Sequence, residues 1–257
     1  MSLSDAELER YARHIVLPQV GGVGQRKLKA ARVAVVGAGG IGSAVIPALA
    51  GAGVGRLTII DDDVVEMSNL QRQTIFRDDQ VGVGKAEAAA AFASALNPSV
   101  EVTAAADRIG PANAEHLLAG HDLIIDGCDN FATRLAVNEG AVRLQTPLVS
   151  AAAAQFQGQI ALLRGWQAEQ PCYRCFVGDA FDAEACDTCA ELGVLGALTG
   201  AVGHLAALLG IRALLGVGEE SEGKLFLIDA LSFSVRAIRI PKDPACATCG
   251  GGDAAGS

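Results

Sequence analysis

The chain has 257 residues, of which 51% are hydrophobic and 19% are charged, and this composition excludes a disordered protein. Its formal charge of −9 excludes the basic surface that non-specific nucleic-acid binding requires. The length allows one α/β domain with a sizeable core, and the polar N-terminal segment carries no signal-peptide pattern, so we expect a cytoplasmic protein.

The first strongly patterned segment predicts a strand, a helix and a second strand, at residues 32–37, 41–53 and 56–61. Between the first strand and the helix, three glycines follow the G-x-G-x-x-G spacing: Gly37, Gly39 and Gly42. Such glycines let phosphate approach backbone N–H groups at a helix N-terminus, and an acid that ends the next strand, here Asp61, binds ribose hydroxyls. This order of elements predicts a nucleotide-binding site.

The alternation of helices and strands continues through the middle of the chain. We expect helices at residues 85–98, 111–120 and 131–144, and strands at residues 100–106, 121–130 and 146–153. This pattern predicts an α/β fold with a Rossmann-like, mostly parallel central sheet and flanking helices. Because ligands collect at the carboxyl ends of parallel strands, the polar segments 68–76 and 126–130 should lie at the nucleotide site.

The second half of the chain has a different pattern. Residues 157–165 and 223–240 predict antiparallel strands that pack one face and extend the sheet. The apolar run 193–211 has about the minimum length of a membrane span. We expect a buried helix instead and no membrane association, because small residues allow close backbone approach along it, at Gly196, Gly200 and Ala207.

Two classes of enzyme fit a Rossmann-like opening. An NAD-dependent oxidoreductase needs an acid or base beside the nicotinamide, and no supporting groups accompany the four histidines, which are His14, His116, His121 and His204. The cations near the predicted site, Arg72 and Lys85, suit phosphate, and the carboxylate of Asp129 suits Mg²⁺. These three residues also disfavour a third alternative, a non-catalytic protein that retains the fold.

Four segments of the chain resemble the ubiquitin-activating-type adenylyltransferases, the group that includes the bacterial molybdopterin-synthase, ThiF and HesA enzymes. They are residues 10–28, 37–76, 81–89 and 126–134. The pattern D-x-D-x-V-x-x-S-N-L-x-R-Q, which begins at Asp61, is specific to this family, and the match runs from about Glu9 to Gly250. The resemblance implies that ATP adenylates the C-terminal glycine carboxylate of a ubiquitin-like sulfur carrier ending in Gly-Gly. The product serves thiocarboxylate formation in molybdopterin or thiamine-thiazole biosynthesis.

The resemblance also implies roles for individual residues. The nucleotide-binding set carried over by motif is Gly37, Gly39, Gly42, Asp61, Asp63, Asn69, Arg72, Lys85 and Asp129. Within it, Asp61 holds the ribose, Asp129 holds Mg²⁺, and the amides beside Arg72 orient its guanidinium toward phosphate. Arg13 matches an arginine that acts in the neighbouring subunit's site, which implies a homodimer. The attacking carboxylate is already ionised at pH 7, so no general base is required.

Six of the seven cysteines form three C-x-x-C pairs, Cys172/Cys175, Cys186/Cys189 and Cys246/Cys249, while Cys128 is expected to be a small buried residue. Any two pairs could form a tetrahedral zinc site, and spacing alone favours the first two. The resemblance implies instead that the first and last pairs bind Zn²⁺. It places Cys189 in a segment with a reactive cysteine, although Cys186 has no match and could form a disulfide with it.

These inferences give one adenylyltransferase domain at residues 1–250 and a disordered tail at 251–257. We expect the nucleotide-binding half at about residues 30–150. The carrier-binding and zinc half then covers about residues 151–250. Sulfur is expected from a separate donor protein.

Overall fold

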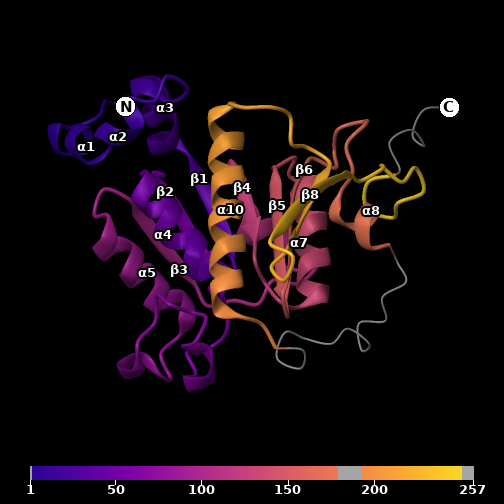
Figure 1. Ribbon diagram of the computed structural model, residues 1–257, viewed down its shortest axis with the longest axis horizontal. Helices are drawn as coiled ribbons and strands as arrows, with labels where there is room; N and C mark the ends of the chain where they lie inside the picture. The colour runs from indigo at the N-terminus through magenta and orange to yellow at the C-terminus, as the bar shows by residue number, and fades with distance from the viewer. Residues whose placement is uncertain (1, 179–192, 251–257) are drawn as a thin grey trace.

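The frame of the protein is one eight-stranded sheet with strand order β3-β2-β1-β4-β5-β6-β7-β8 (Figure 1). The computed structural model describes residues 2–178 and 193–250. Five strands are parallel: β1 Arg32–Val36, β2 Arg56–Ile60, β3 Glu101–Ala105, β4 Leu123–Asp126 and β5 Leu148–Ala154. Three are antiparallel: β6 Gln157–Leu163, β7 Lys224–Asp229 and β8 Ser234–Arg239. This sheet confirms the predicted fold class.

Helices cover both faces of the sheet, because successive side chains of a buried strand point to opposite sides. In β1, Val33 and Val35 join one core and Ala34 and Val36 join the other. The first core lies under α3 Gly21–Ala30, α4 Gly42–Ala52, α5 Lys85–Leu96 and α10 Gly196–Leu215. The second lies under α6 Ala114–Leu118, α7 Phe131–Arg143 and α8 Tyr173–Val177. Short helices α1 Asp5–Arg10 and α2 Ala12–Ile15 precede them, and η1 Met67–Asn69 and η2 Asp78–Gln80 follow β2.

The strand order reverses at β1, and this reversal creates the crevice that holds the site. The chain runs outward from β1 to β2 and β3, then returns to place β4 on the other side of β1. The last residue of β1, Val36, is paired with Ile60 of β2 and with Asp126 of β4. The loops that follow these three strands therefore emerge together at one edge of the sheet, as expected for a nucleotide fold.

Helix α10 is long and apolar enough to cross a membrane, with 20 residues and a mean hydropathy of 1.6, but half of it is buried inside this fold. A side chain at Gly196 would overlap the loop around Gln71, and Ala207 is 1% exposed, as predicted. Gly200 differs from the prediction, because nothing lies within 4 Å of a Cβ built there. The close crossing of α4 is made instead at Gly203, where a Cβ would overlap the Ile41 carbonyl.

Two other regions differ from the sequence-based expectation. The helix expected at residues 111–120 is limited to α6 Ala114–Leu118. Strand β8 was expected to pack one face, but all six of its residues are exposed. It is the last strand of the sheet and pairs with β7 alone, so neither of its faces receives the cover that the central strands have.

Candidate active site and metal centre

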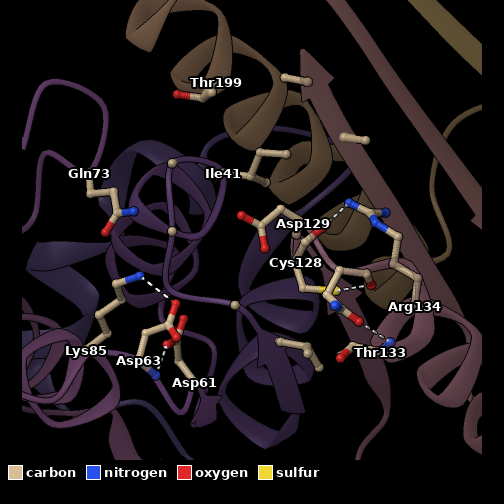
Figure 2. A pocket seen from close by; sticks show the side chains of 18 of the residues that line it. Ile41, Asp61, Asp63, Gln73, Lys85, Cys128, Asp129, Thr133, Arg134 and Thr199 are labelled. Carbon is tan, nitrogen blue, oxygen red and sulfur yellow. Dashed lines mark hydrogen bonds and ion pairs between the residues drawn. The ribbon is translucent and has the colours of Figure 1, made fainter. Parts of the chain in front are cut away.

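A cavity of about 640 Å³ opens at the carboxyl ends of β1, β2 and β4 (Figure 2). This volume lies within the range of ligand pockets, ~300–1,000 Å³. Most of the predicted nucleotide-binding residues line it: Gly37, Gly39, Asp61, Asp63, Asn69, Arg72, Lys85 and Asp129. The structure thus brings together residues that are spread over more than ninety positions of the chain.

The turn after β1, residues 37–42, is called the glycine turn, and it needs its glycines for two different reasons. Gly37 has a φ of +87°, in the left-handed region that favours glycine, and a Cβ at Gly42 would overlap the Gly37 carbonyl. Gly42 therefore closes the turn and is not part of the cavity wall. At Gly39, a Cβ would have only Gln73 Nε2 near it, at 3.8 Å, so the missing side chain leaves open space above the backbone. A phosphate can approach the backbone there.

Asp61 lies at the end of β2 and is held by the glycine turn. Its Oδ2 accepts a hydrogen bond from the Ala38 backbone N–H at 2.7 Å, and its Oδ1 accepts one from Asp63 N–H at 2.9 Å. Burial raises the pKa of Asp61, and these two hydrogen bonds oppose the rise. Each carboxylate oxygen keeps a second lone pair. Asp61 can therefore accept ribose hydroxyls without losing its contacts to the turn.

Lys85 begins α5 and is nearly buried, with 8% of its side chain exposed. Its Nζ lies 2.9 Å from Asp63 Oδ2, and its backbone N–H donates to the Asp63 carbonyl, also at 2.9 Å. Asp63 therefore fixes both ends of the lysine at the cavity wall. The ammonium group has three donors, so two remain for phosphate oxygens.

The polar segment after η1 supplies an arginine and a buried glutamine. Arg72 NH1 donates to the Ser68 carbonyl at 3.2 Å, so the expectation that the neighbouring amides orient it was wrong. Gln73 is 2% exposed, and its Oε1 has no hydrogen-bond partner among the described residues. A buried acceptor without a donor is costly, so a ligand that donates to it is favoured. Sequence analysis missed Gln73 as a site residue, although Gln73 is the last residue of the family pattern that begins at Asp61.

The loop after β4 presents Asp129 to the cavity. The side chain is exposed and points toward the glycine turn (Figure 2). Its neighbour Cys128 also lines the cavity and is only half-buried, which corrects the expectation of a plain core residue. Burial and then the charge of Asp126 raise the pKa of Cys128 well above its ordinary value, so the thiol is protonated at pH 7.

Arg134 is a second cavity residue that sequence analysis missed. It is 6% exposed, and its guanidinium donates to the Cys128 carbonyl, to the Ala151 carbonyl at 2.7 Å and to Ser150 Oγ at 3.2 Å. Burial disfavours the charged form, but Asp126, 3.6 Å away, keeps the pKa of Arg134 above its ordinary value. The sequence offered one signal for Arg134, because a charged residue in the first turn of a buried helix needs polar partners.

A further predicted active-site residue does not line this cavity, and three other predictions fall outside the described residues. Arg13 is exposed on α2 and does not line the cavity of its own chain. Cys186 and Cys189 lie outside the described residues, as does the tail 251–257.

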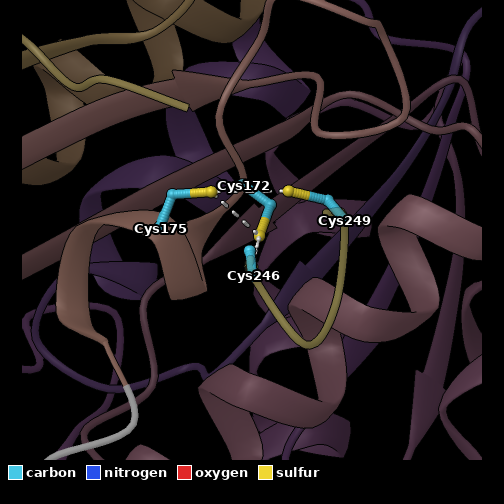
Figure 3. Close-up of side chains that lie close together, drawn as sticks. All are labelled: Cys172, Cys175, Cys246 and Cys249. Carbon is cyan, nitrogen blue, oxygen red and sulfur yellow. Dashed lines mark hydrogen bonds between the residues drawn. The ribbon is translucent and has the colours of Figure 1, made fainter. Parts of the chain in front are cut away.

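Four cysteines form a separate cluster where the start of α8 meets the C-terminal turn (Figure 3). The Sγ–Sγ distances are 3.6 Å for Cys172–Cys246, 3.4 Å for Cys175–Cys249 and 4.0 Å for Cys172–Cys175. Four thiolates around zinc at ~2.3 Å stand about 3.8 Å apart, whereas a disulfide has sulfurs at ~2.05 Å. The residues therefore fit Zn²⁺, and the pairs that come together are the first and the last.

Two cysteines of this cluster, Cys172 and Cys246, are buried, and Cys175 and Cys249 are partly buried. Burial raises the pKa of Cys172 to about 11, and the Asn138 amide opposes the rise. A bound Zn²⁺ would favour the thiolate form of these cysteines. Asn138 is 1% exposed, and its Oδ1 accepts a hydrogen bond from Tyr173 N–H at 2.7 Å.

Comparison with known proteins shows a family whose members resemble this chain. The sequence profile of the ThiF family matches residues 11–248. The sulfur carrier protein adenylyltransferase of Thermus thermophilus is 44% identical over 255 residues, covering 97% of this chain and 93% of the relative. The molybdopterin-synthase adenylyltransferase of Escherichia coli is 40% identical over 248 residues, covering 96% and 98% of the two chains.

A solved structure shares the architecture. The crystal structure of Escherichia coli MccB with ATP superposes with a TM-score of 0.82 at 25% identity, covering 96% of this chain and 75% of that one. This chain therefore shares its fold with that protein.

Proposed function

The chain belongs to the ThiF family, and on that premise we propose that it is an adenylyltransferase that activates a sulfur-carrier protein with ATP. One observation carries this proposal. A single cavity gathers an open glycine turn, an acid for ribose, two cations for phosphate and a carboxylate for Mg²⁺, represented by Gly39, Asp61, Arg72, Lys85 and Asp129. These are the groups that adenylyl transfer requires.

The proposed reaction needs no proton transfer. The C-terminal carboxylate of the carrier is an anion at pH 7, and one of its oxygens attacks the α-phosphorus of ATP. A new oxygen–phosphorus bond forms, the bond from the α-phosphorus to the bridging oxygen breaks, and pyrophosphate leaves with its electron pair. The products are an acyl-adenylate and pyrophosphate.

The chain's cations act on the charge that develops during this step. Arg72 and Lys85 hold phosphate oxygens, and fixed positive groups that face the leaving group stabilise the transition state. Asp129 and its loop would hold Mg²⁺, which neutralises phosphate charge when bound. Asp61 and the glycine turn orient the nucleotide, so that the α-phosphorus faces the incoming carboxylate.

The main alternative is an NAD-dependent oxidoreductase. Among the described residues that line the cavity there is no histidine, and the cysteine there, Cys128, is protonated. The cavity instead offers Arg72 and Lys85, which suit a triphosphate. The family membership and these side chains together favour adenylyl transfer.

We assign nucleotide binding to about residues 30–150, and carrier and zinc binding to about residues 151–250. Large apolar side chains are exposed on and beside the β7–β8 hairpin, namely Leu231 at 73%, Phe233 at 95% and Val235 at 60%. An edge strand with such residues suits a folded protein partner. Gly158 and Leu227, from the neighbouring strands, line the cavity, so a Gly-Gly tail from a carrier docked here can reach the nucleotide.

A homodimer would complete the site. Leu205 and Leu208 are 41% and 54% exposed on the outer side of α10, and Val16 is 72% exposed after α2. Burying such side chains against a second copy is favourable. Arg13 is on α2 and is exposed, so it is available to a partner's cavity. Thiocarboxylate formation would then draw sulfur from a separate donor, in the cytoplasm, where thiols remain reduced.

The test is ATP–pyrophosphate exchange that depends on a carrier protein. We expect exchange with a ubiquitin-like carrier ending in Gly-Gly, and none when the last glycine is deleted. Parallel reactions with molybdopterin-type and thiazole-type carriers identify the preferred substrate. No exchange with either carrier, in a folded protein that binds NAD⁺ and not ATP, would refute the proposal.

A further inference from the structure

The zinc cluster and the nucleotide cavity are joined by one short series of buried contacts through α7. Cys172, a candidate zinc ligand, is followed directly by Tyr173, which is 6% exposed. Helix α7 holds this tyrosine at two points. Asn138 Oδ1 accepts its backbone N–H at 2.7 Å, and Arg134 lies over its ring, with the guanidinium carbon 5.9 Å from the ring centroid.

These two contacts come from residues one helical turn apart. Arg134 and Asn138 are at positions i and i+4 of α7, so they lie on the same side of the helix. The backbone of Tyr173 is thus fixed by one of them and its ring by the other. A displacement at the start of α8, where Cys172 lies, would therefore move the ring that contacts Arg134.

The same guanidinium also holds the loop that carries Asp129. Its guanidinium donates to the Cys128 carbonyl, and Cys128 directly precedes Asp129. It is also bound to the Ala151 carbonyl of β5 at 2.7 Å, so it has little freedom to follow the loop alone. Tyr173 therefore lies between this arginine and Cys172 of the cysteine cluster.

We propose that Tyr173 is a positioning residue that couples the zinc centre to the Mg²⁺–nucleotide site. With zinc bound, Cys172 sets the start of α8, the Tyr173 ring supports Arg134, and Arg134 holds the Cys128–Asp129 backbone in the orientation that faces the nucleotide. The zinc centre therefore contributes to metal–nucleotide affinity as well as to the stability of the C-terminal turn. This inference rests on the proposed binding of Mg-ATP in the cavity.

The test compares three variants by titration calorimetry and zinc analysis. Tyr173→Leu removes the ring, Tyr173→Phe keeps it, and Phe176→Leu is the matched control. Phe176 lies in the same helix and packs edge-on to Tyr173, with ring centroids 6.4 Å apart, and among the described residues the cation–π contact of Arg134 is with Tyr173 and not with Phe176.

We expect Tyr173→Leu to keep one zinc and to need about tenfold more Mg²⁺ for half-maximal ATP binding, the order of effect of losing a buried cation–π contact. Its affinity for ATP without Mg²⁺ should change little, because Asp129 acts through the metal. Phe176→Leu should bind as the wild type does, and Tyr173→Phe, which keeps the ring and loses the hydroxyl that interacts with Arg134, should lose less affinity for Mg²⁺ than Tyr173→Leu. A general loss of packing would instead weaken both forms of ATP, and it would affect Phe176→Leu as well.

A second arm removes zinc from the wild type with a chelator while the thermal midpoint is recorded. The Mg²⁺ requirement should rise in the wild type and should not rise further in Tyr173→Leu. If Tyr173→Leu does not fold, Arg134→Lys, which keeps the charge and loses the planar contact, replaces it with the same expected result. Wild-type Mg²⁺ dependence in a zinc-loaded Tyr173→Leu or Arg134→Lys protein overturns the coupling. Failure of the wild type to bind Mg-ATP overturns the proposed function instead.

Discussion

Replacing Arg72 by alanine separates catalysis from stability more clearly than any other change at this site. Among the described residues, the side chain of Arg72 makes one hydrogen bond, from NH1 to the Ser68 carbonyl at 3.2 Å, and this bond is exposed to solvent. Its loss should cost about 1 kcal/mol or less. For a chain of this length that corresponds to a fall in thermal midpoint of about 2–4 °C at most.

The expected effect on the reaction is much larger. If the guanidinium holds the triphosphate, it makes charge-assisted contacts that strengthen as negative charge moves to pyrophosphate. Removing one such contact costs ~3–4 kcal/mol, or roughly two to three orders of magnitude in rate. Arg72→Lys should recover part of this loss, because a point charge replaces the planar fork only incompletely.

The assay is carrier-dependent ATP–pyrophosphate exchange, with the thermal midpoint measured on the same samples. Arg77→Ala is the control, because Arg77 lies in the same segment, forms an exposed ion pair with Asp79 at 3.0 Å and does not line the cavity. It should exchange at the wild-type rate. A folded Arg72→Ala protein with near-native exchange would refute the role assigned to Arg72.

Three further predictions concern metal, assembly and pH. Cys246→Ser should lose the single zinc expected per chain, whereas Cys189→Ser should retain it; metal analysis showing the reverse pattern would contradict the assignment. Arg13→Ala and Asp129→Ala should each be inactive, and mixing them under subunit exchange should restore part of the activity, since one site of the mixed dimer has both native residues; mixed dimers without activity would exclude a shared site. Glu7→Gln should lower the thermal midpoint at pH 7, because the hydrogen bond from its lysine partner lowers the pKa of Glu7 below its ordinary 4.5. That contribution is present above pH 4.5 and is lost as the pH falls through the lowered value, so an undiminished difference between the two proteins near pH 2 would show that the carboxylate charge is not its source.

Most of the fold could be predicted because its signals are local. A buried parallel strand needs a continuous apolar run, such as residues 33–36, and the turn after it needs a residue that tolerates φ of +87°, as Gly37 does. Strong local patterns failed where tertiary context sets the outcome. The hydrophobic pattern of β8 is compatible with a strand that packs one face, but the position of β8 at the edge of the sheet leaves every residue exposed.

The candidate site was partly visible for a similar reason. Asp61, Arg72, Lys85 and Asp129 are polar residues at the ends of predicted strands or in the segments that follow them, and parallel strands bring such segments to one edge of the sheet. Arg134 was missed because its role depends on three carbonyl and hydroxyl groups from two other segments. Nothing in its local sequence shows that they surround it.

The sequence by itself determined that three C-x-x-C pairs exist and that any two could form a metal site. Spacing left the choice open and the family resemblance indicated the first and last pairs; the tertiary structure brings these two together, because it returns the Sγ atom of Cys249 to within 3.4 Å of the Sγ atom of Cys175 across 74 residues. Local spacing favours the nearer pair, but the chain closes the longer loop because β7 and β8 extend the sheet back toward the start of α8. Loop closure costs only about 0.6 kcal/mol for each doubling of length, so packed strands can override proximity in sequence.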